Sequence, residues 1–257
     1  RDAGPPGVMP PDAAAKLKIL QHQLGVTRLA DITGLDCAGV SVVQAVRPFS
    51  KSNAVSQGKG ATLNAAARSA LMESAESFFA ERIERYAVTV APATRLGVSP
   101  GLYNHHADPD VHRHWRDWDI AWIPGTNLLD GSATLVPLEL VHTAYVVPPP
   151  DYDGVFRTST TGLAVSPSRS RAVRHGLLEC IERDAIARAH TRHGFLHDNR
   201  FDPYTVQSPE LDDLMGALRG RGFLVGLWLA PAVGGVPVVW CHLMEDCAAD
   251  QAILPNP

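Results

Sequence analysis

Long apolar runs are missing from this chain of 257 residues, and none approaches the roughly 20 residues that a membrane-spanning helix needs. A surplus of basic residues is missing as well, because 23 Lys and Arg stand against 27 Asp and Glu, for a formal net charge of −4. Non-specific nucleic-acid binding depends on concentrated positive charge. These absences argue against a membrane protein and against a nucleic-acid-binding protein.

Cysteine is scarce. The four cysteines are Cys37, Cys180, Cys241 and Cys247, and none of them stands in C-x-x-C spacing. We interpret them as reduced thiols and expect a cytoplasmic protein. A Walker motif is absent too, so nucleotide binding of the P-loop type is not indicated.

Histidines gather in one polar segment, as His105, His106, His112 and His114. Zinc sites combine such residues with Cys or carboxylates at fixed spacings, and no such spacing accompanies these four. We therefore expect a solvated connection here rather than a metal site.

Helical and strand-like segments are interspersed along the chain, which favours an α+β fold. We expect a leader and a short helix over residues 1–24, followed by one domain over 25–257. Ser166 and Pro167 are the predicted N-cap and first-turn proline of the second long helix. The predicted elements of the domain are a strand pair in 27–48, a Gly-rich turn at 56–60, helices over 62–86, 166–190 and 211–219, short strands within 119–147, and core strands over 223–229 and 237–244.

The two long predicted helices resemble each other. When the chain is shifted so that the first helix lies on the second, a Gly-containing turn precedes both, at 58–60 and at Gly162. The identical residues are then Ala66, Arg68, Leu71, Glu73, Glu76 and Arg82 in the first helix and Ala172, Arg174, Leu177, Glu179, Glu182 and Arg188 in the second. A duplicated turn-helix unit explains these identities economically, and chance similarity between two amphipathic helices is the alternative.

Each helix carries two glutamates three residues apart, Glu73 with Glu76 and Glu179 with Glu182. This spacing places both carboxylates on one face of a helix, where like charges repel. Mg²⁺ prefers oxygen ligands and usually takes one or two carboxylates, completing its shell with phosphate oxygens and water. A single E-x-x-E pair is common on helix surfaces, but its repetition beside apolar residues favours a magnesium site built from both helices.

Gly58-Lys59-Gly60 precedes the first of these helices. Glycines let a backbone approach a phosphate, a helix N-terminus offers unpaired N–H groups, and Lys59 adds a positive charge. We therefore predict that this segment lies near the phosphates of a nucleotide. Ser69 and Arg183, on the two helices, are further candidates for nucleotide contact, and a role confined to the helix surface is the alternative for each.

Two of these segments resemble the signatures of the YcaO superfamily. Residues 56–60 (Ser-Gln-Gly-Lys-Gly) followed by 69–76 (Ser-Ala-Leu-Met-Glu-Ser-Ala-Glu) are similar to the first signature, and 176–185 (Gly-Leu-Leu-Glu-Cys-Ile-Glu-Arg-Asp-Ala) to the second. The stretch 123–141 is similar to the segment between them. Val46-Arg47-Pro48 is most similar to the branch that works with a TfuA partner.

This resemblance implies a YcaO-like fold, with duplicated turn-helix units packed on mixed or antiparallel sheets around a nucleotide site. It implies an enzyme that uses ATP and Mg²⁺ to phosphorylate backbone amide oxygens of a ribosomally made peptide or a protein, for thioamide or azoline formation. Carried over by position, Lys59 and Arg183 would contact the nucleotide. The residues that would hold Mg²⁺ and phosphates are Glu73, Glu76, Glu179 and Glu182.

The resemblance also implies partners, and the chain differs from the family's usual pattern at several places. We expect a precursor peptide or protein as substrate and a TfuA-like protein as partner, and the sequence leaves a homodimer open. Family members usually have a further helical block that completes the nucleotide site, and we expect it to be absent because the chain stops at Pro257, soon after Met244. Thr161 precedes Gly162 where the family often has Asn, and residues 254–257 are only faintly similar to a Pro-rich family tail.

Two alternatives belong to other classes of protein. A non-catalytic scaffold of the same fold would present a peptide to a partner protein, and the expected loss of the helical block favours it. A carboxylate-bridged di-iron protein would need Glu-x-x-His on two helices, and neither helix has that spacing. The residues that perform chemistry on the amide stay unassigned.

Overall fold

The computed structural model describes residues 11–111, 114–191, 199–230 and 234–246. The chain forms two compact units, residues 1–33 with 40–172 and residues 34–39 with 173–257. No helix in the described ranges is both long and apolar enough to cross a membrane. His112, Cys247, the first ten residues of the predicted leader and the tail at 254–257 lie outside the described residues.

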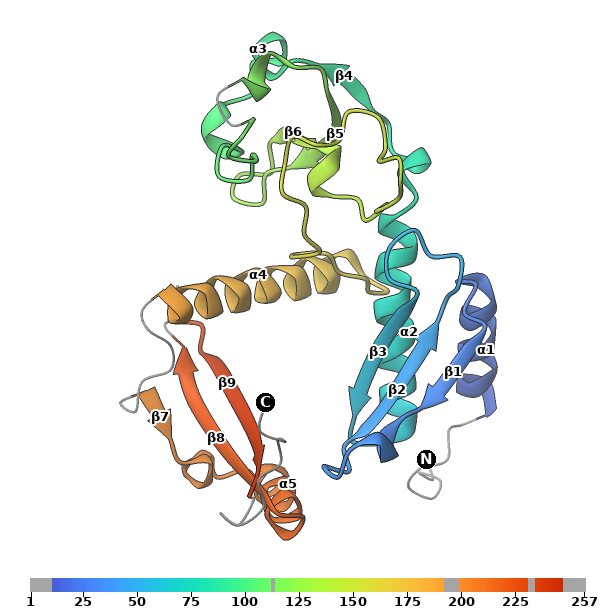
Figure 1. Cartoon of the computed structure of the whole chain (residues 1–257), viewed down its shortest axis with the longest axis vertical. Helices are drawn as coiled ribbons and strands as arrows, with labels where there is room; N and C mark the ends of the chain where they lie inside the picture. The colour runs from blue at the N-terminus through green and yellow to red at the C-terminus, as the bar shows by residue number, and fades with distance from the viewer. Residues whose placement is uncertain (1–10, 112–113, 192–198, 231–233, 247–257) are drawn as a thin grey trace, which may run out of the picture. The chain divides into compact units, whose positions relative to one another are not determined.

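The first unit begins with helix α1 (Pro11–Gln23) and a three-stranded antiparallel sheet of β1 (Arg28–Asp31), β2 (Ser41–Val46) and β3 (Val55–Gly60), in that order. Helix α2 (Leu63–Ala80) lies along one face of this sheet (Figure 1). The strand pair predicted in 27–48 is confirmed. The apolar core of this half of the unit consists of Leu24, Val26, Val43, Ala45, Ala66, Ala70, Leu71 and Ala75.

The Gly-rich turn predicted at 56–60 is wrong, because these residues belong to strand β3. The glycines are needed because the strand approaches α2 closely. A Cβ on Gly58 would lie 2.1 Å from the carbonyl oxygen of Ala66 and from the nitrogen of Ala70, and one on Gly60 would also be too close to the helix. The two glycines therefore permit the packing of helix on sheet.

Helix α2 confirms the first long helix, although it is shorter than predicted. Thr62 is its N-cap, and the hydroxyl oxygen accepts the N–H of Ala65 at 3.2 Å. The helix ends at Ala80, and the 3₁₀ helix η2 (Ile83–Arg85) follows before Tyr86.

The rest of the first unit contains a second antiparallel sheet, in the order β4 (Thr89–Ala91), β5 (Ile120–Thr126) and β6 (Ala133–Pro137), and the short helix α3 (Ala93–Leu96). Strands β5 and β6 confirm the short strands predicted within 119–147, whereas β4 was not predicted. The aromatic core of this region is formed by Trp115, Trp122 and Phe156, with Tyr103 packed against them.

The second unit contains most of helix α4 (Arg169–Thr191), then β7 (Arg200–Phe201), α5 (Pro209–Gly220), β8 (Phe223–Ala230) and β9 (Val238–Glu245). Its sheet is antiparallel in the order β7-β8-β9. These elements confirm the predicted second and third helices and the two core strands, and β7 was not predicted.

The predicted N-cap at Ser166 is wrong, because α4 starts three residues later. The hydroxyl oxygen of Ser168 accepts the N–H of Arg171 at 3.4 Å and so takes the capping position. In α5, Ser208 is the cap, with Pro209 in the first turn.

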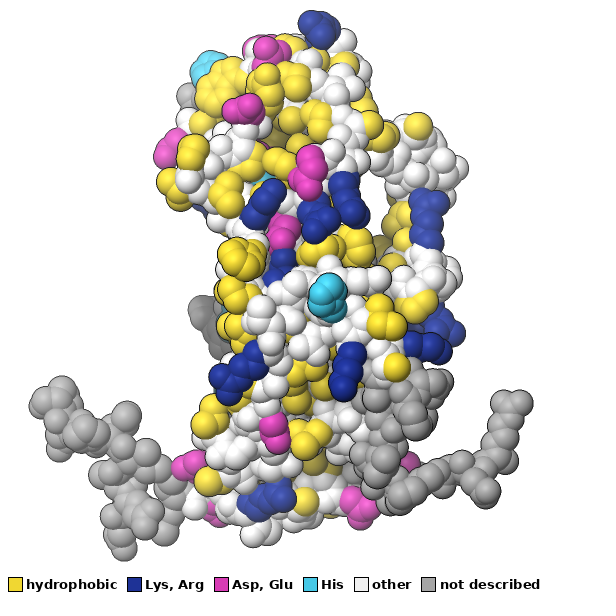
Figure 2. Space-filling view, turned by 90° about the vertical axis from the view of Figure 1, so that its right-hand side faces the viewer, with side chains coloured by type: hydrophobic (Ala, Val, Ile, Leu, Met, Phe, Trp, Pro, Cys, Tyr) yellow, Lys and Arg dark blue, Asp and Glu magenta, His cyan; other side chains and the backbone are white. Residues whose placement is uncertain are grey.

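Short 3₁₀ helices connect several elements: η1 (Thr33–Leu35), η3 (Pro100–Leu102), η4 (Trp115–Asp117), η5 (Leu138–Leu140) and η7 (Pro203–Val206). Helices interspersed with antiparallel sheets confirm the predicted α+β class. Basic, acidic and apolar side chains are interspersed on the face that Figure 2 shows, as expected for a chain with a small net charge.

Candidate functional site

The first predicted site residues meet where α2 packs beside β3, the edge strand of its sheet. The side chain of Glu73 is exposed, yet partial burial of its carboxyl raises the pKa, while the N–H of Gln57 and the charge of Lys59 act in the opposite direction. Gln57 and Lys59 are both residues of β3. The structure therefore brings Lys59 and Glu73, both predicted from the sequence, into one local environment.

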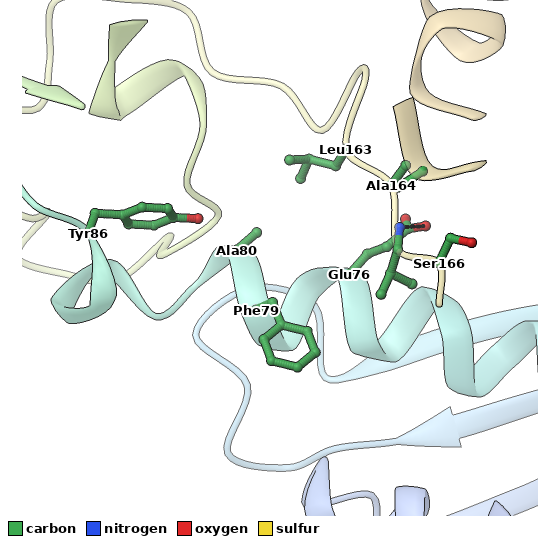
Figure 3. A pocket seen from close by; sticks show the side chains of 9 residues that line it. Glu76, Phe79, Ala80, Tyr86, Leu163, Ala164 and Ser166 are labelled. Atoms are coloured by element: carbon green, nitrogen blue, oxygen red, sulfur yellow. Dashed lines mark hydrogen bonds between the residues drawn. The ribbon is translucent and has the colours of Figure 1, made fainter. Parts of the chain in front are cut away.

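Glu76 lies one turn further along α2 and is half-buried. Its Oε1 accepts the backbone N–H of Val165 at 3.3 Å. The residue also lines a pocket of about 290 Å³ together with Phe79, Ala80 and Tyr86, and Figure 3 shows Tyr86 and Glu76 at opposite ends of it. A largely apolar pocket therefore adjoins the acidic pair of α2.

The second acidic pair lies on α4. Glu179 is half-buried and Glu182 is exposed. The Nη2 of Arg183 lies 3.6 Å from the Oε1 of Glu179, one helical turn away, so these two predicted residues form an ion pair with each other. On the same helix Ile181 and Ala185 pack toward Ala230 and Val238 of the sheet, which holds α4 in the second unit.

The two acidic helices differ more in structure than in sequence. Leu71, beside the first pair, is fully buried, whereas its counterpart Leu177 is 48% exposed. A strand leads into α2, but a loop containing Gly162 leads into α4. Leu177 therefore lacks the buried environment of Leu71, and the duplication stays a prediction.

Mg²⁺ fits carboxylate pairs of this kind. Within the described ranges no three or more His, Cys, Asp or Glu side chains form a group that could hold a metal ion. One pair on each helix is nevertheless enough for a cation that takes one or two carboxylates and fills its other positions with phosphate oxygens and water. The pair of α2 belongs to the first unit and the pair of α4 to the second, so a shared magnesium site is a prediction.

Three other groups of predicted residues lie at the surface. Ser69 is exposed on α2, in the turn before Glu73. His105, His106 and His114 are exposed as well. The cysteines within the described ranges, Cys37, Cys180 and Cys241, are free thiols.

Sequence reasoning missed a buried ion pair between Arg47 and Glu81, which are 3% and 4% exposed. Both ends of the guanidinium donate to the carboxylate, and the hydroxyl of Ser50 and the N–H of Lys51 donate to its Oε2 at 3.0 Å. Burial acts to raise the pKa of Glu81, but the Arg47 guanidinium and these hydrogen bonds outweigh it and the pKa is lowered. Arg47 therefore anchors the loop after β2 to the end of α2.

A second buried carboxylate, Glu139, was also missed. It accepts the backbone N–H groups of Gly154, Val155 and Phe156 at 2.8, 3.1 and 3.0 Å. Burial raises the pKa of Glu139 in spite of these hydrogen bonds. Because the carboxylate accepts hydrogen bonds from three backbone N–H groups of one loop, we assign Glu139 a structural role.

Gly97-Val98-Ser99-Pro100-Gly101 matches the G-x-S-x-G pattern of nucleophile elbows. That motif needs a strand before the serine and a helix after it. Here α3 precedes the segment, Gly97 ends that helix in the left-handed conformation with φ 66°, and only the 3₁₀ helix η3 follows. The match is therefore a helix C-cap and not a catalytic elbow.

Comparison with known families gives a match that spans both acidic helices. The model of a family described as YcaO cyclodehydratase, ATP- and Mg²⁺-binding, matches residues 57–255. This range contains both glutamate pairs, Lys59 and Arg183. The predicted cofactors, ATP and Mg²⁺, agree with the family's description.

Relatives match over long stretches. A protein of Methanothermobacter thermautotrophicus is 35% identical over 193 residues, which cover 74% of this chain and 49% of that protein. A protein in the tfuA 3′ region of Rhizobium leguminosarum bv. trifolii is 30% identical over 254 residues, which cover 95% of this chain and 58% of that protein. The second relative agrees with the predicted similarity to the TfuA-associated branch. The chain spans about half the length of these curated relatives.

Solved structures share the fold. YcaO from Methanopyrus kandleri bound with AMPPCP and Mg²⁺ has a TM-score of 0.66 and 24% identity, covering 89% of this chain and 55% of that one. A heterocyclase in complex with substrate and cofactor has a TM-score of 0.69 and 19% identity, covering 90% of this chain and 36% of that one. The family match over most of the sequence and this shared fold lead to one conclusion: the chain belongs to the YcaO cyclodehydratase family.

Proposed function

We propose that this chain carries the nucleotide site of an enzyme that uses ATP and Mg²⁺ to activate backbone amides of a peptide or protein. The observation that carries the proposal is the environment of Glu73. Its partly buried carboxyl lies on α2 under the influence of the charge of Lys59 on β3, within the range that matches an ATP- and Mg²⁺-binding family. A carboxylate that lies within the electrostatic influence of an ammonium group suits a cation bound to a polyphosphate.

Each predicted site residue receives a role in this proposal. Lys59 and Arg183 offer positive charge to phosphate oxygens, and Ser69 offers an exposed hydroxyl. Arg183 also pairs with Glu179 on the same helix, one turn away. The residues that would hold Mg²⁺ are Glu73 and Glu76 of α2 and Glu179 and Glu182 of α4.

ATP supplies a phosphoryl group for the amide oxygen, which turns a poor leaving group into phosphate. A Cys, Ser or Thr side chain that attacks the activated carbon gives an azoline, and a sulfide source gives a thioamide. The chain's own contribution is to hold the reacting groups in position and to neutralise phosphate charge. The similarity to a protein from a tfuA region supports a TfuA-like partner. The fold shared with a heterocyclase in complex with its substrate supports a bound substrate, for which we propose a precursor peptide or protein.

Mass spectrometry of a candidate precursor peptide tests the proposal. After incubation with the chain, its partner, ATP, Mg²⁺ and a sulfide source, we expect a loss of about 18 Da for an azoline or a gain of about 16 Da for a thioamide. Glu73→Gln and Glu179→Gln should abolish the product. Glu84→Gln is the matched control, because Glu84 is 61% exposed and pairs only loosely with Lys51, at 3.8 Å.

The scaffold alternative gives the opposite pattern. A peptide that binds to the chain but stays unmodified, with no Mg²⁺-dependent binding of AMPPCP, would replace the enzyme by a non-catalytic peptide-presenting protein.

A further inference from the structure

The second unit contains a pocket that the nucleotide proposal does not use. It has a volume of about 370 Å³ and lies where β7 ends and the chain turns toward α5. Its lining consists of Arg200, Phe201, Asp202, Pro203, Arg219 and Val225. Two arginines from different elements thus face one cavity.

Each guanidinium group lies over an aromatic ring. The Cζ of Arg200 lies 5.9 Å from the ring centre of Trp228, and the Cζ of Arg219 lies 5.0 Å from that of Tyr204. In the described part of the chain, neither arginine takes part in an ion pair with a carboxylate. A cation–π contact leaves the N–H donors of a guanidinium for a ligand, and such donors match a carboxylate well.

Asp202 limits the charge of the ligand. Its Oδ1 accepts the backbone N–H of Tyr204 at 3.0 Å and so begins the 3₁₀ helix η7. Two guanidinium groups and one carboxylate leave a single net positive charge in the lining. A singly charged carboxylate matches that balance, whereas a phosphate with nearly two negative charges would also be repelled by Asp202.

The edge of β8 that faces β7 is only partly paired. Strand β7 pairs with β8 only at Leu227 and Trp228, although β8 begins at Phe223. Pro203 has no N–H to continue the ladder, and the chain turns away there. Within the described ranges, β8 from Phe223 to Gly226 therefore has no strand beside it on this side, and such an edge can pair with an extended peptide.

We propose that this pocket binds an acidic side chain of an extended peptide that lies along the open edge of β8. Arg200 and Arg219 receive the carboxylate, and the half-buried Phe201 and Val225 receive the neighbouring apolar side chains of the peptide. That this peptide is the precursor substrate is an inference that rests on the proposed function. That the pocket binds an acidic peptide is independent of the proposed function.

Fluorescence anisotropy tests the pocket with a defined probe. The probe is a labelled peptide of about ten residues with alternating Val and Glu, the pattern of an added strand, and the comparison peptide has Gln in place of Glu. We expect saturable binding of the Glu peptide to the full chain without ATP. Arg200→Gln and Arg219→Gln should each weaken it about tenfold, and the Lys variants should weaken it less, because they keep the charge but lose the fork of donors.

Arg174→Gln is the control, because Arg174 is an exposed arginine of the same unit outside the pocket and its loss should leave the affinity unchanged. Equal binding of the Gln peptide, or equal affinity in the Arg200 and Arg219 variants, would overturn the proposal. Displacement of the probe by inorganic phosphate at similar concentration would overturn the preference for a carboxylate. Calorimetry with AMPPCP and Mg²⁺ on the same variants reports on the nucleotide site separately, so failure of the peptide site leaves the proposed function standing.

Discussion

Glu73 combines a partly buried carboxyl, a raised pKa and a nearby positive charge from Lys59. Burial makes the ionised form of this carboxyl costly, and a bound cation offsets that cost by favouring the charged form. The same environment would be of little use to a purely structural glutamate on a helix surface. For this reason the nucleotide proposal depends more on Glu73 than on any other residue.

The raised pKa of Glu73 leads to a pH prediction. Only the ionised carboxyl binds a cation, so Mg²⁺-dependent binding of AMPPCP should weaken as the pH falls through the pKa of Glu73. Because burial raises that pKa, the loss should begin at a higher pH than an ordinary glutamate would give. Calorimetry between about pH 4 and pH 7 measures this profile. If Glu73→Gln left both the affinity and the profile unchanged, Glu73 would not be a ligand of the cation.

Glu81 contributes to the stability of the fold rather than to ligand binding. Its folded pKa is lowered, so its contribution to stability is present above the pKa of the unfolded chain and is lost as the pH falls through the folded value. Glu81→Gln leaves Arg47 buried without its counter-charge, and we expect a loss of about 3–5 kcal/mol in the free energy of unfolding at neutral pH. Urea denaturation measures the loss, with Glu84→Gln as the exposed comparison; a change within about 0.5 kcal/mol would contradict the account.

Strand β3 and helix α2 form the supporting element of the candidate site. The strand carries Gln57 and Lys59, the helix carries Glu73, and Gly58 sets how closely the two approach. The position of Lys59 relative to Glu73 thus depends on a backbone contact at a glycine. A change at this glycine should affect stability and nucleotide binding together.

Gly58→Ala tests this dependence. The added Cβ would meet backbone atoms of Ala66 and Ala70 at 2.1 Å, which cannot move as a flexible side chain would, so we expect a loss of at least about 2 kcal/mol in unfolding free energy. Gly34→Ala is the control, because nothing lies within 4 Å of its added Cβ. Thermal and urea unfolding compare the two variants. Equal stabilities would mean that β3 does not pack on α2 at this distance.

Elements with a long and regular pattern were predicted from the sequence, and those defined by distant contacts were not. Helices α2 and α5 and strands β8 and β9 carry apolar patterns that predicted them, and helix α4 was predicted from its start signal and its likeness to α2. Gly58 and Gly60 were interpreted as a turn because a close helix–strand approach gives the same local signal as a turn. The short strands β4 and β7 carry too few residues for a pattern, and the role of Glu139 depends on loop N–H groups that only the fold brings to it.

Among the site residues, the sequence identified Lys59 and Glu73, which the structure brings into one local environment. It also identified Glu179 and Arg183, but not that they pair with each other. Residue types and spacing identified these four residues. The different surroundings of the two acidic pairs were not predictable, because the identical residues Leu71 and Leu177 are buried in one helix and exposed in the other.

Across the whole chain, one glutamate pair belongs to each compact unit. Our central proposal is that both pairs hold the same Mg²⁺-bound nucleotide; the family's description gives ATP and Mg²⁺ as what the family binds. If they do, the two pairs are coupled energetically. The loss of binding free energy on substituting one pair then depends on whether the other pair is intact. Two independent surface pairs would show no such coupling.

The most direct measurement is a double-mutant cycle of AMPPCP binding in the presence of Mg²⁺, with Glu73→Gln, Glu179→Gln and the combined variant. Each single variant should weaken binding about tenfold or more, and the combined loss should differ from the sum of the two by at least about 0.5 kcal/mol. Mg²⁺-dependent binding that survives both substitutions undiminished, or losses that add without coupling, would contradict a nucleotide shared by α2 and α4.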